Sequence, residues 1–441
     1  MGPRATAWAW IRKRATRVLP RGRFARSVAV LAGGTALGQA IVVLASPIVT
    51  RLYTPGDFGV LAVYSSILGI LSVIASLRYE LGISLPEKDE DAANLLALSL
   101  GTVVFTALLV VIGTWLLGAQ IVHWANASAL RPYLWLLPVG VVMVGTYNVL
   151  NYWAVRKQDF TRIARTKLNQ GVGSVTTQIG LGLLKSGPLG LLISRIVGQA
   201  AGITTLAMLA YKKDKKALGA IRPSQMRYMA ARYRRFPLFS SGAALLNALG
   251  LQIPVLLLSA FYGAQVAGQF ALVQRVLGVP LTLIGTSVSQ VYLSRAAIEA
   301  RTDVEGLQRL FYSVAKRLAA LGFIPAIVLF ATGPLLFALL FGDQWRQAGI
   351  YAQVMAAMFL GAFLTVPLSY TFIVVERQDL SVIWNGLRFL LSAGSIYLAY
   401  GMRWSAIHAI AVYSLGMLAG YLTLFLLSAH AIRSRTTNTE V

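Results

Sequence analysis

The chain has 441 residues, of which 57% are hydrophobic and 12% are charged, and its formal net charge is +25. Soluble domains carry about 25% charged residues, so this composition excludes a soluble domain and indicates a membrane protein with many spans. The sequence has no cysteine and only three scattered histidines, which excludes disulfides and thiolate chemistry and argues against a metal site, and no cofactor is expected.

Twelve segments hold the roughly 20 apolar residues that a helix needs to cross the hydrocarbon core of a membrane. They lie at 28–50, 58–85, 92–117, 132–155, 166–186, 188–211, 237–261, 266–292, 317–341, 349–374, 381–400 and 406–430. The connections between them leave no room for a soluble domain. The predicted fold class is therefore an all-α polytopic membrane protein with about twelve transmembrane helices.

The distribution of Lys and Arg predicts the orientation of the chain. Residues 1–26 form a basic tail that resembles the start of a signal peptide, but the apolar run after it is too long and lacks a clear cleavage site, so we expect a retained first span. With the N-terminus in the cytoplasm, 31 of the 40 Lys and Arg residues fall in cytoplasmic tails and loops, five fall outside and four within the membrane. Because short basic loops stay in the cytoplasm, both termini are predicted to be cytoplasmic, the C-terminal tail being 433–441.

The most basic loop, residues 212–236, has apolar residues at approximately helical spacing among its arginines. This pattern predicts a cytoplasmic linker that includes a basic helix lying on the anionic membrane surface. No aromatic platform or nucleic-acid-binding fold accompanies the charge, so we expect no nucleic-acid partner.

Two short patterns recur along the chain in the same order. The spacing of Gly59, Ala62 and the triplet 68–70 returns at Gly268, Ala271 and the triplet 277–279, and VRKQDF at 155–160 returns as VERQDL at 375–380. They predict a duplicated unit of six spans, with an N-terminal lobe at 27–211 and a C-terminal lobe at 237–432. Six is even, so the lobes share one orientation and are related by an axis along the membrane normal, as in transporters that bind substrate between two bundles.

Charged residues within the predicted spans indicate what such a site would bind. Four arginines, Arg78, Arg195, Arg275 and Arg388, accompany a single carboxylate, Glu80. Unpaired cations in hydrocarbon are costly, so the excess predicts a water-filled electropositive cavity for a negative group, and the arginine fork suits phosphate. Arg275 is the best candidate because it is too deep to reach the interface easily. Each arginine is alternatively explained by a helix-end carbonyl or the interface.

Glu80 is a possible proton-coupling residue, although a lone carboxylate near the interface is more often structural. On a continuous helix, Arg78 and Glu80 would point in nearly opposite directions, so we expect that they do not neutralise each other. Further polar side chains are predicted to line the cavity, although helix packing alone would also explain them. They are Gln39, Asn148, Asn151, Tyr152, Gln178, Asn247 and Gln290.

Several motifs carry a family resemblance over essentially the whole chain. GGTALGQ at 33–39, RLYTPGDFG at 51–59, LRYE at 77–80 and LFGDQWRQAGIYAQV at 340–354 resemble bacterial polysaccharide flippases of the O-antigen (Wzx) type. That family belongs to the multidrug/oligosaccharidyl-lipid/polysaccharide (MOP) superfamily. The resemblance implies two six-helix lobes in a MATE-like fold around a V-shaped cationic cavity. It also implies a substrate of undecaprenyl-pyrophosphate-linked oligosaccharide, moved from the cytoplasmic to the periplasmic leaflet.

The expected protein is therefore not an enzyme but a flippase of the bacterial inner membrane. Its expected partners are the lipid-linked oligosaccharide, membrane lipid, a polysaccharide polymerase and glycosyltransferases. One alternative is a cation-coupled multidrug exporter of the same superfamily, which would need buried carboxylates for a cationic drug. A second is a peptidoglycan-precursor flippase, which differs only in substrate. A membrane glycosyltransferase or polymerase would need a larger catalytic loop outside the membrane than this chain has.

Overall fold

A computed structural model describes residues 23–437, and every regular element in that range is helical. The N-terminal lobe contains α2 (Arg23–Leu44), α3 (Ser46–Leu52), α4 (Pro55–Ile74), α5 (Asp89–Trp124), α6 (Leu136–Arg156), α7 (Phe160–Leu183) and α8 (Pro188–Lys213). The C-terminal lobe contains α11 (Ser241–Tyr262), α12 (Ala264–Thr302), α13 (Val304–Phe341), α14 (Arg346–Thr365), α15 (Thr371–Val374), α16 (Gln378–Gly401) and α17 (Ala406–Thr437). The predicted basic tail at 1–26 lies almost wholly outside the described residues.

Short helices connect these elements. They are η1 (Tyr79–Ser84), η2 (Ser128–Tyr133), α9 (Lys215–Leu218), α10 (Pro223–Arg232), η3 (Phe236–Ser240), η4 (Asp343–Trp345) and η5 (Pro367–Tyr370). The linker helix α10 packs against the start of α5, where its Met229 is buried. This part of the linker therefore packs against the N-terminal lobe.

Ten helical segments of the described chain are long and apolar enough to cross a membrane. The predicted spans at 132–155 and 166–186 correspond to α6 and α7, which are not among these ten but pack within the N-terminal lobe against α5, α8 and α2; α7 is the more polar of the two. The predicted all-α polytopic fold is confirmed, and the chain is a multi-pass membrane protein.

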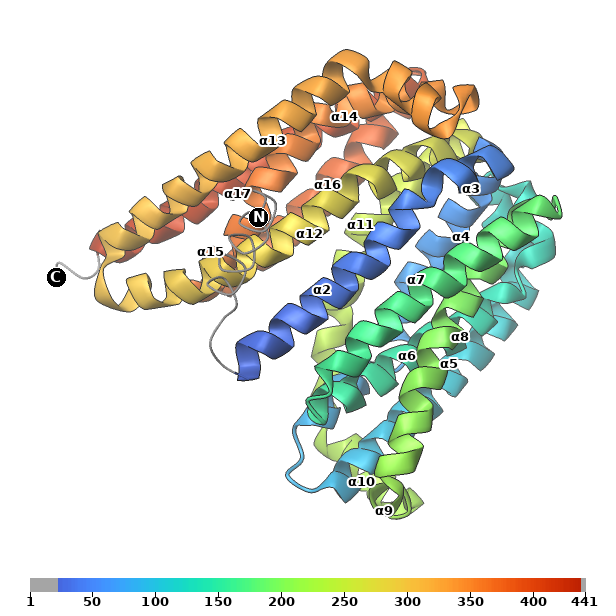
Figure 1. Cartoon of the computed structure of the whole chain (residues 1–441), viewed down its shortest axis with the longest axis vertical. Helices are drawn as coiled ribbons and strands as arrows, with labels where there is room; N and C mark the ends of the chain where they lie inside the picture. The colour runs from blue at the N-terminus through green and yellow to red at the C-terminus, as the bar shows by residue number, and fades with distance from the viewer. Residues whose placement is uncertain (1–22, 438–441) are drawn as a thin grey trace, which may run out of the picture.

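The two lobes form a V (Figure 1). They converge near α3 and the turn between α13 and α14, which we call the closed end, and they diverge toward the other end, which we call the open end. Helices α4 and α12 make the main contact between the lobes. They approach closely through Gly59 and Gly268, where an added Cβ would collide with the backbone of the opposite helix. These two glycines are equivalent positions of the sequence repeat, so the repeated units meet at the same residue, as expected beside a two-fold axis.

At the closed end, side chains of each lobe donate hydrogen bonds to backbone carbonyls of the other lobe. Trp345 is fully buried, its Nε1 donates to the Thr50 carbonyl at 3.0 Å, and its ring meets that of Phe58 edge-on at 4.9 Å. Gln344 donates to the same Thr50 carbonyl at 2.7 Å. Arg51 donates to two carbonyls at the end of α13 at 3.1 and 3.2 Å. These bonds fix α3 against the C-terminal lobe.

Local sequence explains how α4 begins, and the backbone conformation after Ile74 shows where it ends. Thr54 and Asp57 form a capping box around Pro55, so the RLYTPGDFG motif starts the helix. The prediction of one span over 58–85 is wrong at its far end, because the helix stops at Ile74. Leu77 and Arg78 adopt left-handed backbone conformations with φ of 48° and 62°, which a continuing α-helix does not allow.

Candidate functional site

A polar cavity of about 470 Å³ lies beneath the closed end, between the N-terminal lobe and α12. Five helices, α2, α4, α7, α8 and α12, contribute its lining. The lining residues are Thr35, Gly38, Gln39, Val42, Phe58, Leu61, Ala62, Ser65, Lys167, Gln170, Gly171, Ser174, Gln178, Arg195, Gly198, Gln199, Ala271 and Arg275.

Glycines bring the helices around the cavity close together. A Cβ on Gly38 of α2 would lie 2.6 Å from the Lys167 carbonyl of α7, and one on Gly171 would lie 2.8 Å from the Gly38 carbonyl. On α8, a Cβ on Gly198 would lie 3.1 Å from the Gln170 carbonyl. Small residues at these crossings allow backbones to touch and leave the longer polar side chains of α7 and α8 to line the cavity.

The cavity is strongly cationic. Lys167, Arg195 and Arg275 line it together, and none of its lining residues is acidic. None of the three cations forms an ion pair with another side chain in the described part of the protein. Arg275 donates to the Val42 carbonyl of α2 at 3.3 Å, and the Lys167 ammonium lies 4.8 Å from the ring centroid of Tyr147. Arg195 is exposed toward the cavity. The arrangement therefore leaves positive charge free to meet an anion.

Amides and hydroxyls surround these cations. Gln170 donates to Gln199 at 3.0 Å, and Gln178 donates to Ser174 and Ser194 at 3.2 and 3.1 Å. The side-chain carbonyl oxygen of Gln178 is buried and has no hydrogen-bond partner among the described residues. Such groups can exchange hydrogen bonds with a ligand that carries many hydroxyls.

Four of the predicted site residues meet in this cavity: Gln39, Gln178, Arg195 and Arg275. Arg388 and Asn247 lie elsewhere, between α16 and α11 of the C-terminal lobe, where the arginine donates to the asparagine side chain at 2.5 Å. Both were predicted to line the cavity, and the structure pairs them with each other instead.

The other predicted positions also lie apart from this cavity. Asn148, Asn151 and Tyr152 are half-buried on α6 and are not among its lining residues, and the Asn151 side-chain oxygen has no hydrogen-bond partner in the part of the chain that the structure describes. Gln290 is exposed on α12, about 22 Å along the helix from Arg275.

Arg78 and Glu80 occupy the turn after α4. The Arg78 guanidinium approaches the Glu80 carboxylate to 3.8 Å, and the buried carboxylate also accepts a hydrogen bond from Ser76. The expectation that these residues point apart is therefore wrong, because it assumed a continuous helix where the backbone turns through left-handed residues. Glu80 thus has two partners inside the protein.

Lys167 is a cavity residue that sequence reasoning missed, because it was counted with the basic residues of the cytoplasmic loop. Helix α7 already begins at Phe160, so the residue lies well within the helix. A signal was present: Lys167, Gln170, Ser174 and Gln178 follow each other at intervals of three or four residues, which places them on one helical face.

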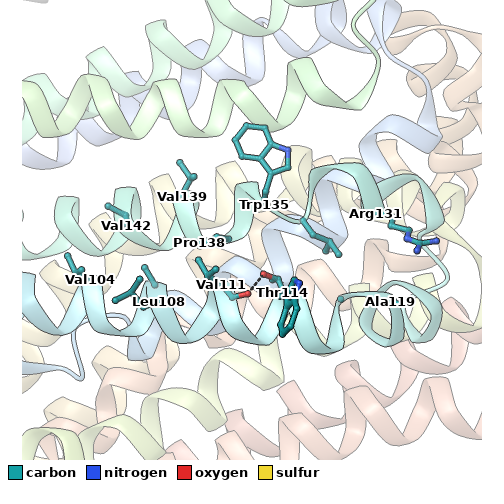
Figure 2. Close-up of a pocket in the computed structure, with 14 residues that line it drawn as sticks. Val104, Leu108, Val111, Thr114, Ala119, Arg131, Trp135, Pro138, Val139 and Val142 are labelled. Carbon is teal, nitrogen blue, oxygen red and sulfur yellow. Dashed lines mark hydrogen bonds between the residues drawn. The ribbon is translucent and has the colours of Figure 1, made fainter.

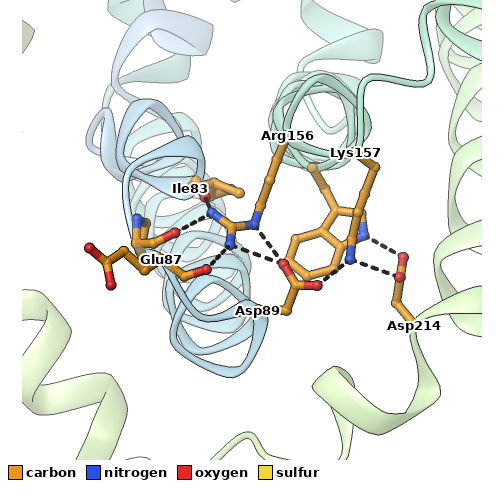
Figure 3. A network of polar contacts seen from close by, with 8 residues as sticks. Ile83, Glu87, Asp89, Arg156, Lys157 and Asp214 are labelled. Atoms are coloured by element: carbon orange, nitrogen blue, oxygen red, sulfur yellow. Dashed lines mark hydrogen bonds and ion pairs between the residues drawn. The ribbon is translucent and has the colours of Figure 1, made fainter.

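A network of charged groups fixes the open end of the N-terminal lobe (Figure 3). Asp89 at the start of α5 accepts from Arg156 at 3.0 Å and from Lys157 at 2.7 Å, and Lys157 also pairs with Asp214 at 3.0 Å. Arg156 donates further to the carbonyls of Ile83 and Pro86. Burial opposes the charge of Lys157, but the hydrogen bonds from the two carboxylates outweigh it and raise its pKa. The network ties the ends of α5, α6 and α8 together.

The equivalent motif in the C-terminal lobe, at residues 375–380, forms a smaller ionic contact. Arg377, which corresponds to Lys157 in the repeat, pairs at 2.9 Å with Asp379 in the first turn of the helix that it precedes, α16, and both side chains are about half exposed. The repeat has therefore kept the motif but holds helix ends together with it in only one lobe.

Comparison with known proteins supports this architecture. Residues 48–350 match the family described as polysaccharide biosynthesis protein. The chain is 26% identical over 166 residues to the teichuronic acid biosynthesis protein TuaB of Bacillus subtilis (strain 168), a match that spans 37% of this chain and only 34% of TuaB.

Two solved structures show the fold. One is an inward-facing multidrug resistance MATE family transporter of the MOP superfamily, with a TM-score of 0.76 and 14% identity over 93% of this chain and 99% of that one. The other is the lipid II flippase MurJ in an inward closed conformation, with a TM-score of 0.67 and 10% identity over 90% of this chain and 86% of that one. The chain thus has the two-lobed fold of MOP transporters.

Proposed function

Because this chain belongs to the polysaccharide biosynthesis protein family, we propose that it is a flippase for a lipid-linked oligosaccharide, such as an O-antigen or exopolysaccharide repeat unit on undecaprenyl pyrophosphate. One observation carries the proposal: the cavity presents two arginines and a lysine and no carboxylate. A pyrophosphate would supply the negative charge that this cavity lacks, and arginine binds phosphate oxygens through paired hydrogen bonds.

The proposed orientation places the open end of the V in the cytoplasm. The basic linker at 212–236 and the basic ends of α6 and α7 lie at the open end, and positive loops remain on the cytoplasmic side. Both termini are then cytoplasmic, and the substrate head group enters from the leaflet where it is assembled.

In the proposed cycle, Arg195 and Arg275 hold the pyrophosphate while the glutamines of α7 and α8 contact the sugar. The lipid tail stays in the bilayer between the lobes. Neutralising the three cations lowers the cost of bringing the cavity walls together, so substrate binding favours closure of the open end and release of the closed end. The two lobes then rock about the contact between α4 and α12, and the head group leaves on the periplasmic side.

The first experiment is deletion of the gene in its native host, followed by complementation with variants. We expect deletion to abolish surface polysaccharide while intact lipid-linked oligosaccharide accumulates on the cytoplasmic leaflet. Loss of one charged hydrogen bond to phosphate costs about 1.5–3 kcal/mol, so Arg195→Gln and Arg275→Gln should each lower export roughly 10- to 150-fold. Arg388→Gln is the matched control, since it removes a half-buried arginine outside the cavity.

Normal export by both cavity variants at wild-type protein levels would refute the role of the cationic cavity. Normal surface glycan in the deletion strain, with altered sensitivity to cationic drugs, would identify a multidrug exporter instead. The fold shared with MurJ keeps a peptidoglycan-precursor flippase as the second candidate. Deletion would then arrest cell-wall synthesis while surface polysaccharide is still made.

A further inference from the structure

A second hollow, separate from the cationic cavity, lies on the outer surface of the N-terminal lobe between α5 and α6 (Figure 2). Its volume is about 810 Å³, and most of its wall is apolar, with Val104, Leu108 and Val111 on α5 facing Val139 and Val142 on α6. We call this hollow the α5–α6 groove. Its residues take no part in the proposed transport path.

The groove is deep because its floor consists of small residues. Ala107 and Gly118 of α5 lie against α6, and a Cβ on Gly118 would come within 2.8 Å of the Leu134 side chain. Within residues 23–437 the walls are left open: Leu108 is 57% exposed and Trp115 is 83% exposed. In a membrane, this surface faces hydrocarbon.

The length of the groove matches one leaflet. From Val104 to Ala119 the helix rises about 22 Å. Half of a bilayer with its headgroup regions included is about 20–22 Å thick, so a groove of this length can reach from the middle of the bilayer to the level of the headgroups. Trp115 and Trp135 line the half of the groove nearer the closed end, as expected for aromatic residues near the membrane interface.

A single cation stands at the headgroup end. Arg131, on η2 between α5 and α6, lines the groove at its closed-end extremity, as Figure 2 shows. It is exposed and forms no ion pair within residues 23–437. The groove is thus mostly apolar along its length. At the end where a lipid phosphate would lie, it presents the guanidinium of Arg131, which has no anionic partner among the described residues.

We propose that the α5–α6 groove binds one anionic glycerophospholipid, with its phosphate on Arg131 and one acyl chain along the floor between α5 and α6. Charge complementarity favours this occupant: a lipid without a phosphate or an apolar protein segment would leave Arg131 without an anionic partner, and the phosphate of a zwitterionic lipid is already balanced by its own ammonium. The site does not depend on the transported substrate, so it stands or falls separately from the proposed function.

Native mass spectrometry of the full-length protein, titrated with phosphatidylglycerol in detergent, tests the proposal. A basic residue near an anionic lipid strengthens binding about fivefold, so Arg131→Gln should lower occupancy of the first bound lipid by about that factor. Arg403→Gln, which removes another exposed arginine at the closed end, should bind like the wild type. Equal occupancy in the wild type and Arg131→Gln would overturn the proposal.

A second variant tests the trough independently of charge. Ala119→Trp places a large side chain in the groove and should displace the lipid although Arg131 is intact. If Ala119→Trp retains the lipid while Arg131→Gln loses it, the headgroup contact exists without a seated chain and the groove assignment is wrong. An equal affinity of the wild type for phosphatidylglycerol and phosphatidylcholine would also refute the predicted selectivity.

Discussion

Replacing Trp345 with phenylalanine is expected to shift the protein toward a conformation with the closed end open. The indole is fully buried between the lobes, donates to the Thr50 carbonyl at 3.0 Å and packs edge-on against Phe58. Phenylalanine keeps an aromatic ring at the interface but cannot donate the hydrogen bond. This contact joins the lobes while the closed end is shut. If it is absent when that end is open, its loss destabilises only the shut conformation.

The size of the effect follows from the contacts. A buried hydrogen bond contributes about 1 kcal/mol net, and the smaller ring forfeits further packing, so the closed end loses about 1–2 kcal/mol. Gln344 still donates to the Thr50 carbonyl at 2.7 Å, so no unpaired acceptor adds to this cost. The population ratio of the two conformations should therefore change roughly 5- to 30-fold.

The absence of native cysteine makes the measurement direct. Spin labels on Leu184→Cys and Met402→Cys, exposed positions at the closed end of opposite lobes, report the separation of the lobes by pulsed electron paramagnetic resonance. In the Trp345→Phe background we expect a longer-distance population to grow. Trp404→Phe, at the same end but partly exposed, is the matched control. An unchanged distance distribution in Trp345→Phe would show that this bond does not hold the closed end shut.

Two further predictions concern stability. Gly268→Leu places a side chain against the backbone of α4 and should cost about 3 kcal/mol or more, seen as a lower thermal midpoint in detergent, whereas Gly278→Leu on the same helix meets open space and should change it little. Similar midpoints for the two variants would contradict the close crossing. Asp89→Asn weakens the bonds to Arg156 and Lys157 and should cost about 1–2 kcal/mol, a modest figure because Asp89 is 46% exposed. Glu87→Gln is the control, and the network has no role in stability if the two variants unfold alike.

Much of the architecture could be predicted because its signals are local in the sequence. A run of about 20 apolar residues specifies a span wherever it occurs, and the capping box at Thr54 specifies the start of α4. The recurring pattern around Gly59 and Gly268 predicted a duplicated bundle. The pattern is visible in the sequence because the two helices cross at these positions, where only glycine fits. The depth of Arg195 and Arg275 in otherwise apolar helices was enough to select two residues of the cavity.

The remaining site features depend on helix rotation and helix ends, which short patterns specify poorly. Arg388 has the same sequence character as Arg275, but α16 turns it toward Asn247 of a neighbouring helix. Helix α4 ends at Ile74 although no glycine or proline follows directly, because Leu77 takes a left-handed conformation that few residues of its type adopt. Tertiary packing determines these helix rotations and helix ends.

In the proposed rocking of the lobes, the glycine crossing of α4 and α12 would also determine how motion is distributed along α12. Gly268 would be the pivot, with Arg275 about 10 Å from it and the far end of the helix at Thr302 about 51 Å away along the helix. A rotation of about 15°, the size of known subunit rotations, would move Arg275 by about 3 Å and the far end by about 13 Å. The short arm would keep the guanidinium beside a bound anion while the long arm swings the mouth of the V shut.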